Sequence, residues 1–349
     1  FTNFSHKPAI ELSRELAELL PKGLTKFTYH DNGSSAVEAA MKMAYQYHNQ
    51  TGHPERQKFM CLDSSYHGET IGALSVGSMD DYAGIFHPLL MDNIHFKGLD
   101  CYRCPYGKTR ETCNIECFES AEEAFEKFGK ETAACIVEPV LQGAAGMRMY
   151  PPAYLTKLRA LCDKYGVLLI DDEIAAGFGR TGKLFAIEHA GVSPDILCTS
   201  KGLTAGYMPM SITVTTDKVY DAFYDDYGTH KAFVHSHTYA GNPMGCAIAL
   251  EVLKIMKRDH ILNKVNEDGK YLHQELMKAL GHHKNVGEIR HIGLINAIEL
   301  VEDPATKKAF PAEKRIGWHV FRKAMAKGLV LRPMGDVIYF NPPLNISRE

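Results

Sequence analysis

The sequence "LLIDDEIAAGFGRTG", which runs from Leu168 to Gly182, is followed by "DILCTSKGLTAG" at 195–206. The first apolar run ends on carboxylates that include Asp172, and the second ends on Lys201, 29 residues later. This spacing fits two neighbouring strands joined by one crossover connection. Because the carboxyl ends of parallel strands meet at one edge of a sheet, the two stretches predict an aspartate beside a lysine at that edge.

Short apolar runs alternate with amphipathic stretches over most of the chain. Runs that are apolar throughout indicate a sheet covered on both faces. The alternation predicts an α/β fold with a mostly parallel sheet and right-handed crossovers. In such sheets ligands bind beyond the carboxyl ends of the strands, where Glu138, Asp172 and Lys201 all lie. The predicted strands are 26–30, 58–63, 133–140, 166–173, 195–200 and 210–216, and predicted helices include 34–50 and 152–165.

The pattern changes after a long helical stretch at 242–258. A chain of 349 residues exceeds the usual size of one domain. We therefore expect a large α/β domain over 1–257 and a smaller α+β domain over 258–349. A polar insert at 97–119 is long for a loop and is expected to shape the functional site.

An aspartate beside a lysine is the pair that a pyridoxal phosphate site needs. The lysine forms a Schiff base with the cofactor, and the aspartate keeps the ring nitrogen protonated. Strand alternation turns Asp172 to one side and its neighbours Asp171 and Glu173 to the other. Two alternatives stand beside this hypothesis, a solvated lysine at a strand end and a metal-binding acidic cluster, although no histidine lies nearby at ligand spacing.

Two turns before helices offer donors for a phosphate group. "DNGSSAVEAAMKMAYQY" places Gly33 and Ser34 at a helix start, where Ser35 and Glu38 are predicted to form a capping box. "HSHTYAGNP" at 235–243 offers Thr238 in the same way. Either turn is also compatible with an ordinary capped helix.

Three further side chains are candidates for binding a planar ring or a carboxylate. Tyr66, in "SSYHGET", is placed to stack on a heterocycle, or alternatively to pack in the core. Arg180, in "GFGRTG", and Arg332, in "LRPMGD", can each clamp a carboxylate through two hydrogen bonds. A surface ion pair is the alternative for either arginine.

The composition excludes several classes of protein. A net charge of −3 gives no indication of nucleic-acid or membrane-surface binding, and no apolar run approaches the length of a membrane span. Nine scattered cysteines favour reduced thiols and a cytoplasmic location. Since the chain starts at Phe1, we interpret it as a fragment. Free thiols are preferred over a zinc site at the cluster Cys101, Cys104, Cys113 and Cys117.

Taken together, these motifs resemble the class III, fold type I aminotransferases over nearly the whole chain. The resemblance rests on "NGSSAVEAAMKMA", "YHGET", "EPVLQGAAGM", "IDDEIAAGFGRTGKLFA", "PDILCTSKGLTAG" and "HTYAGNPMGCA", which occur in family order. It implies pyridoxal 5'-phosphate as cofactor, a small-molecule keto-acid acceptor and amino donor, and a homodimer with shared active sites.

The resemblance also implies a role for each candidate residue. Lys201 would hold the cofactor and move a proton, and Asp172, supported by Glu138, would pair with the ring nitrogen. Tyr66 would stack on the ring, and Gly33, Ser34 and the second subunit's copy of Thr238 would bind phosphate. Arg332 would bind the substrate carboxylate, with Arg180 and position 236, a serine, near the substrate path.

Within the class, "AVEAAMKMAYQY", "EPVLQGAAGMRMYPPAYL" and "GRTGKLFAIEHAGVSPDILC" look most like the enzymes that aminate 8-amino-7-oxononanoate in biotin synthesis. Their characteristic donor is S-adenosylmethionine, but "HSHT" at 235–238 looks like the minority that uses lysine. The family's N-terminal segment, which helps to close the site, is absent. The alternative activity is a class III aminotransferase for ω-amino acids, diamines or polyamines. A racemase of the same fold and a non-catalytic binding protein are more distant alternatives.

Overall fold

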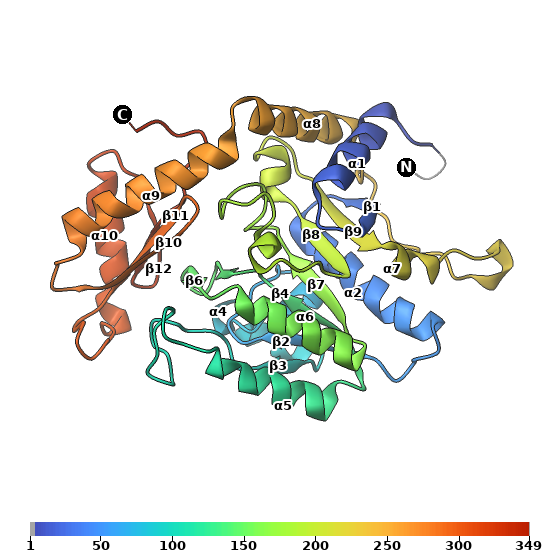
Figure 1. Ribbon diagram of the computed structural model, residues 1–349, viewed down its shortest axis with the longest axis horizontal. Helices are drawn as coiled ribbons and strands as arrows, with labels where there is room; N and C mark the ends of the chain where they lie inside the picture. Colours follow the sequence, from blue (N-terminus) through green and yellow to red (C-terminus); the bar gives the residue numbers. More distant parts are fainter. Residues whose placement is uncertain (1–3, 349) are drawn as a thin grey trace.

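The computed structural model describes residues 4–348 and contains one large and one small sheet with their covering helices (Figure 1). The large sheet has seven strands in the order β1-β9-β8-β7-β4-β2-β3. β9 is antiparallel to both of its neighbours, and the other pairs are parallel, which confirms the predicted mostly parallel sheet. The strands are β1 (Leu24–His30), β2 (Lys58–Leu62), β3 (Ile94–Phe96), β4 (Thr132–Val137), β7 (Leu168–Asp172), β8 (Ile196–Thr199) and β9 (Ser211–Thr216).

Helices cover both faces of this sheet, as its uniformly apolar strands require. Leu169 and Ile170 are consecutive in β7 and face opposite sides, each fully buried in a different core cluster. One face is covered by α1 (Lys7–Leu19), α5 (Glu119–Phe128), α6 (Ala153–Tyr165) and α8 (Pro243–Arg258). The other is covered by α2 (Gly33–Gln50), α3 (Ile71–Ser75) and α7 (Asp217–Asp221).

The small sheet is antiparallel throughout and has the order β10-β11-β13-β12. Its strands are β10 (Val286–Ile292), β11 (Ile295–Leu300), β12 (Arg332–Met334) and β13 (Val337–Phe340). One face packs on α9 (Ile261–Leu280) and α10 (Ile316–Met325). The opposite face packs on a hairpin that follows β4, made of β5 (Leu141–Gln142) and β6 (Arg148–Met149). In Figure 1 the small sheet lies to one side of the large one, and α9 connects it to α8.

The domain limits at 1–257 and 258–349 remain a prediction, since the second sheet establishes only that a small sheet domain follows the large one. Among the described residues, no helix has both the length and the apolar character needed to cross a membrane. The remaining elements are α4 (Asp80–Ala83) and the 3-10 segments η1 (Gly84–Leu89), η2 (Glu116–Phe118), η3 (Ala186–Ala190), η4 (Lys201–Thr204), η5 (Tyr227–Thr229) and η6 (Ala312–Lys314).

Candidate active site

The predicted aspartate and lysine lie at the same edge of the large sheet. Asp172 is the last residue of β7 and pairs in register with Cys198 of β8. Lys201 lies three residues after Cys198, and its backbone φ of 37° is rare for a residue other than glycine. Its side chain is exposed and forms no hydrogen bond or ion pair within residues 4–348. A strained backbone that presents an unpaired amine at a sheet edge is typical of a functional lysine.

Asp172 is buried, with 4% of its surface exposed, and its carboxylate has defined partners on both oxygens. Nδ1 of His67 lies 2.7 Å from Oδ2, and the backbone N–H of Ile174 donates to Oδ1 at 3.0 Å. Because a carboxylate accepts this bond, Nδ1 of His67 carries the proton. Sequence pattern alone gives His67 no such role. Its position directly after Tyr66, in a turn at the carboxyl edge of the sheet, is the signal that could have indicated it.

The support of Asp172 by Glu138 stays a prediction, and the hydrogen bonds of Glu138 go to the backbone of two neighbouring segments. Its Oε2 accepts from the backbone N–H of Tyr66 at 3.1 Å, and its Oε1 accepts from that of Gly143 at 3.0 Å. The hydrogen bond to Asp172 comes from His67 instead. Burial raises the pKa of Glu138 to about 7. Glu138 therefore anchors the Tyr66 turn and the start of the β5–β6 hairpin.

Asp171 and Glu173 face away from Asp172, and both are fully buried. Glu173 accepts a hydrogen bond from the backbone N–H of Ile187 at 2.8 Å. Burial raises the pKa of Glu173 to about 8 and, with the neighbouring carboxylates, raises that of Asp171 well above its usual value. Burial therefore disfavours the charged form of both carboxyl groups.

The start of α2 faces the turn that carries Tyr66 and His67. Ser34 Oγ accepts from the backbone N–H of Glu69 at 3.2 Å, and a Cβ at Gly33 would lie 3.0 Å from Ile174, just beyond Asp172. The predicted capping box of Ser35 and Glu38 is wrong. Asn32 caps the helix by accepting from the N–H of Ser35 at 3.0 Å.

Glu38 is drawn away from the cap by a neighbouring turn. It accepts from Thr70 Oγ1 at 2.6 Å and from the backbone N–H of Gly72 at 2.8 Å. These bonds tie α2 to the segment after Tyr66. The helix start therefore retains the backbone N–H groups of Gly33 and Ser34 as candidate anion donors beside Asp172.

The two candidate arginines have different surroundings. Burial raises the pKa of Tyr66, its hydrogen bond to Glu69 raises it further, and the charge of Arg332 lowers it slightly. The Arg332 side chain is exposed. Arg180 instead donates to the backbone carbonyl of Pro342 at 2.6 Å, and burial lowers its pKa to about 10. Arg180 thus links the glycine-rich loop to the segment after β13.

The segment before α8 lies beside the end of β1. His237 Nδ1 is 3.0 Å from Oδ2 of Asp31, whereas Ser236 and Thr238 are exposed. Within residues 4–348, the Thr238 side chain has no hydrogen-bond partner. Hydrogen bonds link the α2 start to the turn that carries Tyr66, and His67 links that turn to Asp172, whereas no hydrogen bond joins Thr238 to this group.

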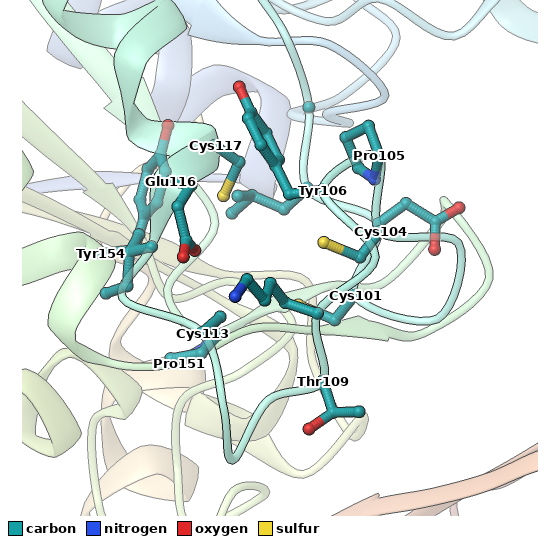
Figure 2. Close-up of a pocket in the computed structure, with 15 residues that line it drawn as sticks. Cys101, Cys104, Pro105, Tyr106, Thr109, Cys113, Glu116, Cys117, Pro151 and Tyr154 are labelled. Carbon is teal, nitrogen blue, oxygen red and sulfur yellow. The ribbon is translucent and has the colours of Figure 1, made fainter.

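The four clustered cysteines line one pocket, and Cys104 and Cys117 point their sulfur atoms into it (Figure 2). All nine cysteines of the chain are free thiols. Burial raises the pKa of the Cys101 thiol to about 12. Among the described residues, neither this cluster nor the acidic run at Asp172 forms a group of three or more side chains that could hold a metal ion.

Comparison with known proteins places this site in a family. The model of the family "Aminotransferase class-III" matches residues 1–349. The chain is 46% identical over 342 residues to an adenosylmethionine-8-amino-7-oxononanoate aminotransferase of Geobacter sulfurreducens, covering 98% of this chain and 75% of that protein. A relative of the same name from Nitratidesulfovibrio vulgaris is 42% identical, and this chain spans 63% of its length.

Solved structures agree with the sequence relatives. The Methanocaldococcus jannaschii enzyme of that name superposes with a TM-score of 0.91 at 38% identity, over 99% of this chain and 76% of that one. An amine transaminase from an uncultivated Pseudomonas species, solved with bound PLP (pyridoxal 5'-phosphate), superposes with a TM-score of 0.94 at 33% identity. The match covers 100% of this chain and 79% of that one. The residues at the carboxyl edge fit that cofactor, since they provide a free lysine, a buried carboxylate and an open helix start. The chain belongs to the class III aminotransferases, and its cofactor is pyridoxal 5'-phosphate.

Proposed function

We propose that this chain transfers an amino group to 8-amino-7-oxononanoate, giving 7,8-diaminononanoate for biotin synthesis. The observation that carries the proposal is the 46% identity to a relative named for this reaction. Relatives with the same name at 39–41% identity come from organisms as distant as Anoxybacillus flavithermus and Methanocaldococcus jannaschii. The alternative is an amine or ω-amino acid aminotransferase, which is favoured by the likeness to ω-transaminase structures at 32–37% identity.

The proposed chemistry divides the work among residues at the carboxyl edge. When bound, pyridoxal phosphate would supply an aldehyde carbon that accepts the amino group and a ring that withdraws electrons. Lys201 would hold the cofactor through its amine and would move the proton at the substrate carbon. Asp172 keeps its negative charge at the ring nitrogen, and His67 orients that carboxylate through the bond at 2.7 Å. Glu138 positions the Tyr66 turn through the Tyr66 backbone.

The remaining candidates bind and orient. Gly33 and Ser34 bind the phosphate at the α2 start, and Tyr66 stacks on the ring. Arg332 binds the carboxylate of the keto acid, which its exposed side chain and its charge effect on the pKa of Tyr66 support. Arg180, whose known bond is to Pro342, and Ser236 lie farther along the substrate path.

A homodimer is part of the proposal. The exposure of Thr238, together with Val234 and Tyr239 at 85% and 75% exposed, supports a role for this segment at a partner's phosphate site. The donor is S-adenosylmethionine or lysine. A cytoplasmic location is also proposed, and the nine free thiols are compatible with it.

Replacing Gly68 by alanine tests the phosphate site. Gly68 has φ 132°, and a Cβ there would lie 2.2 Å from Ser34 Oγ, so the turn and the helix start must separate. Such strain is worth about 1–3 kcal/mol, and we expect cofactor affinity to fall about tenfold or more. The affinity is measured by titrating the apoenzyme with pyridoxal phosphate and following the absorbance. The matched control is Gly84→Ala, because Gly84 has open space around its Cβ position. Equal affinities for the two variants would contradict the assignment.

The substrate assignment is tested with the full-length protein and 8-amino-7-oxononanoate. S-adenosylmethionine and lysine are supplied separately, and 7,8-diaminononanoate is measured by mass spectrometry. We expect product with one of the two donors, and the productive donor is thereby identified. If neither gives product while putrescine or a β-amino acid transfers its amino group to pyruvate, giving alanine and the corresponding carbonyl compound, the alternative activity replaces the proposal.

A further inference from the structure

The inner face of the small sheet carries Arg332 in a row with a second arginine. Arg290, Ala297, Tyr339 and Arg332 are directly opposite one another across β10, β11, β13 and β12. Residues opposite one another in a sheet share a face. The position of Arg332 at the active site therefore depends on how this face is held against the large domain.

Two carboxylates sit directly opposite each other on the same face. Glu288 of β10 pairs with Glu299 of β11, an arrangement that destabilises a sheet when the charges are uncompensated. Arg290 bridges both, donating at 2.9 Å to each, with only 4% of its side chain exposed. One buried cation between two partly buried carboxylates leaves one negative charge without compensation.

The polar insert before η2 supplies two further cations, one for each carboxylate. Arg110 donates to Glu288, and Arg103 donates to Glu299 at 2.6 Å. Burial would raise the pKa of Glu288, but Arg110 and Arg290 outweigh it and hold that pKa below its usual value. The two carboxylates are thus held from two sides, by Arg290 of the sheet itself and by the arginines of the insert.

The same arginines reach the backbone of the β5–β6 hairpin. Arg290 donates to the carbonyls of Met147 at 2.8 Å and Gly146 at 2.5 Å, and Arg110 donates to that of Met149 at 3.2 Å. Gly143, directly after β5, donates its N–H to Glu138, and its carbonyl accepts from the N–H of Met147 at 3.0 Å. Hydrogen bonds therefore connect the active-site turn, through Glu138, Gly143 and Met147, to Arg290 on the face that carries Arg332.

We propose that Arg110 and Arg103 of the insert are positioning residues that set Arg332 for the substrate carboxylate, by fixing the Glu288–Glu299 face against the β5–β6 hairpin. The inference rests on the proposed role of Arg332. Neither insert arginine touches substrate. Their effect is on affinity for carboxylate-bearing acceptors, because the distance from Arg332 to Lys201 is set by this contact.

Arg110→Gln tests the inference in the full-length holoenzyme. We expect KM for 8-amino-7-oxononanoate to rise about tenfold while kcat changes less than threefold. With butanal, an acceptor that has no carboxylate, kcat/KM is expected to stay within twofold. The matched control is Arg159→Gln, which breaks the partly buried pair of Arg159 with Asp195, 2.7 Å apart and outside the small sheet. In the control variant, the ratio of kcat/KM for 8-amino-7-oxononanoate to kcat/KM for butanal should stay unchanged.

Arg332→Gln, measured in parallel, separates this inference from the assignment on which it depends. If Arg332→Gln leaves KM for the keto acid unchanged, the role of Arg332 in the proposed function fails. If Arg332→Gln raises KM and Arg110→Gln does not, or if Arg110→Gln lowers kcat/KM equally for both acceptors, the positioning role is overturned. If Arg110→Gln does not fold, Arg103→Gln gives the same comparison. This variant loses the ion pair of Arg103 with Glu299, in which the arginine is more exposed than Arg110.

Discussion

Replacing Lys201 by alanine is expected to lower kcat for transamination by about 10⁴-fold, the upper range for a proton-transfer group. The structure provides the reason. Lys201 presents a free amine at the end of β8, beside Asp172, from a backbone held at φ 37°. An alanine removes both the covalent attachment and the base, while the groups at the α2 start remain. Single-turnover and steady-state rates with saturating cofactor measure the loss.

Two controls separate a chemical loss from an unfolded protein. Lys183→Ala removes an exposed lysine from the glycine-rich loop and should keep native turnover. Adding methylamine to Lys201→Ala should restore part of the proton transfer, because a small amine can occupy the space of the missing side chain. Near-native turnover of Lys201→Ala without added amine would show that another group acts as the base.

Much of the large domain was predictable because its strands are short, apolar throughout and separated by helices. All six predicted strands form, and Asp172 and Lys201 occupy the same sheet edge. Alternation along β7 correctly separated Asp172 from Asp171 and Glu173, since a strand has a fixed period of two. These features depend on local pattern, which a sequence carries directly.

Contacts between distant segments were not predictable. His67 and Asp172 are 105 positions apart, and only the fold brings them within 2.7 Å. The choice of Asn32 over Ser35 as helix cap depends on Glu38 being bound to Thr70 instead. Both residues have suitable capping side chains, so propensity alone does not decide.

The insert at 97–119 illustrates the same limit at larger scale. Its length indicated a functional loop, but its partners follow from the register of β10 against β11. Glu288 and Glu299 become neighbours only through that register, and only then do Arg103 and Arg110 have a shared target. Sequence spacing contains no signal for a pairing of this kind.

Asp172→Asn is expected to lower kcat by about 10³-fold, because the change removes one negative charge and almost no volume. The amide oxygen can still accept the His67 hydrogen bond, whereas the NH₂ group in the place of Oδ1 can no longer accept from the N–H of Ile174. A neutral amide also gives no charge to favour the protonated ring, so the ring withdraws electrons less strongly. Steady-state kcat and the pH dependence of the cofactor absorbance measure the effect together.

Comparison with His67→Ala and Glu138→Gln shows where the charge acts. His67→Ala keeps the carboxylate but frees its orientation, so we expect a smaller loss of about tenfold to a hundredfold. Glu138→Gln should cost less again, since Glu138 contacts the backbone of Tyr66 and Gly143 rather than Asp172. A loss below tenfold for Asp172→Asn would contradict its role at the ring nitrogen. A larger loss for Glu138→Gln than for His67→Ala would instead restore Glu138 as the group that supports Asp172.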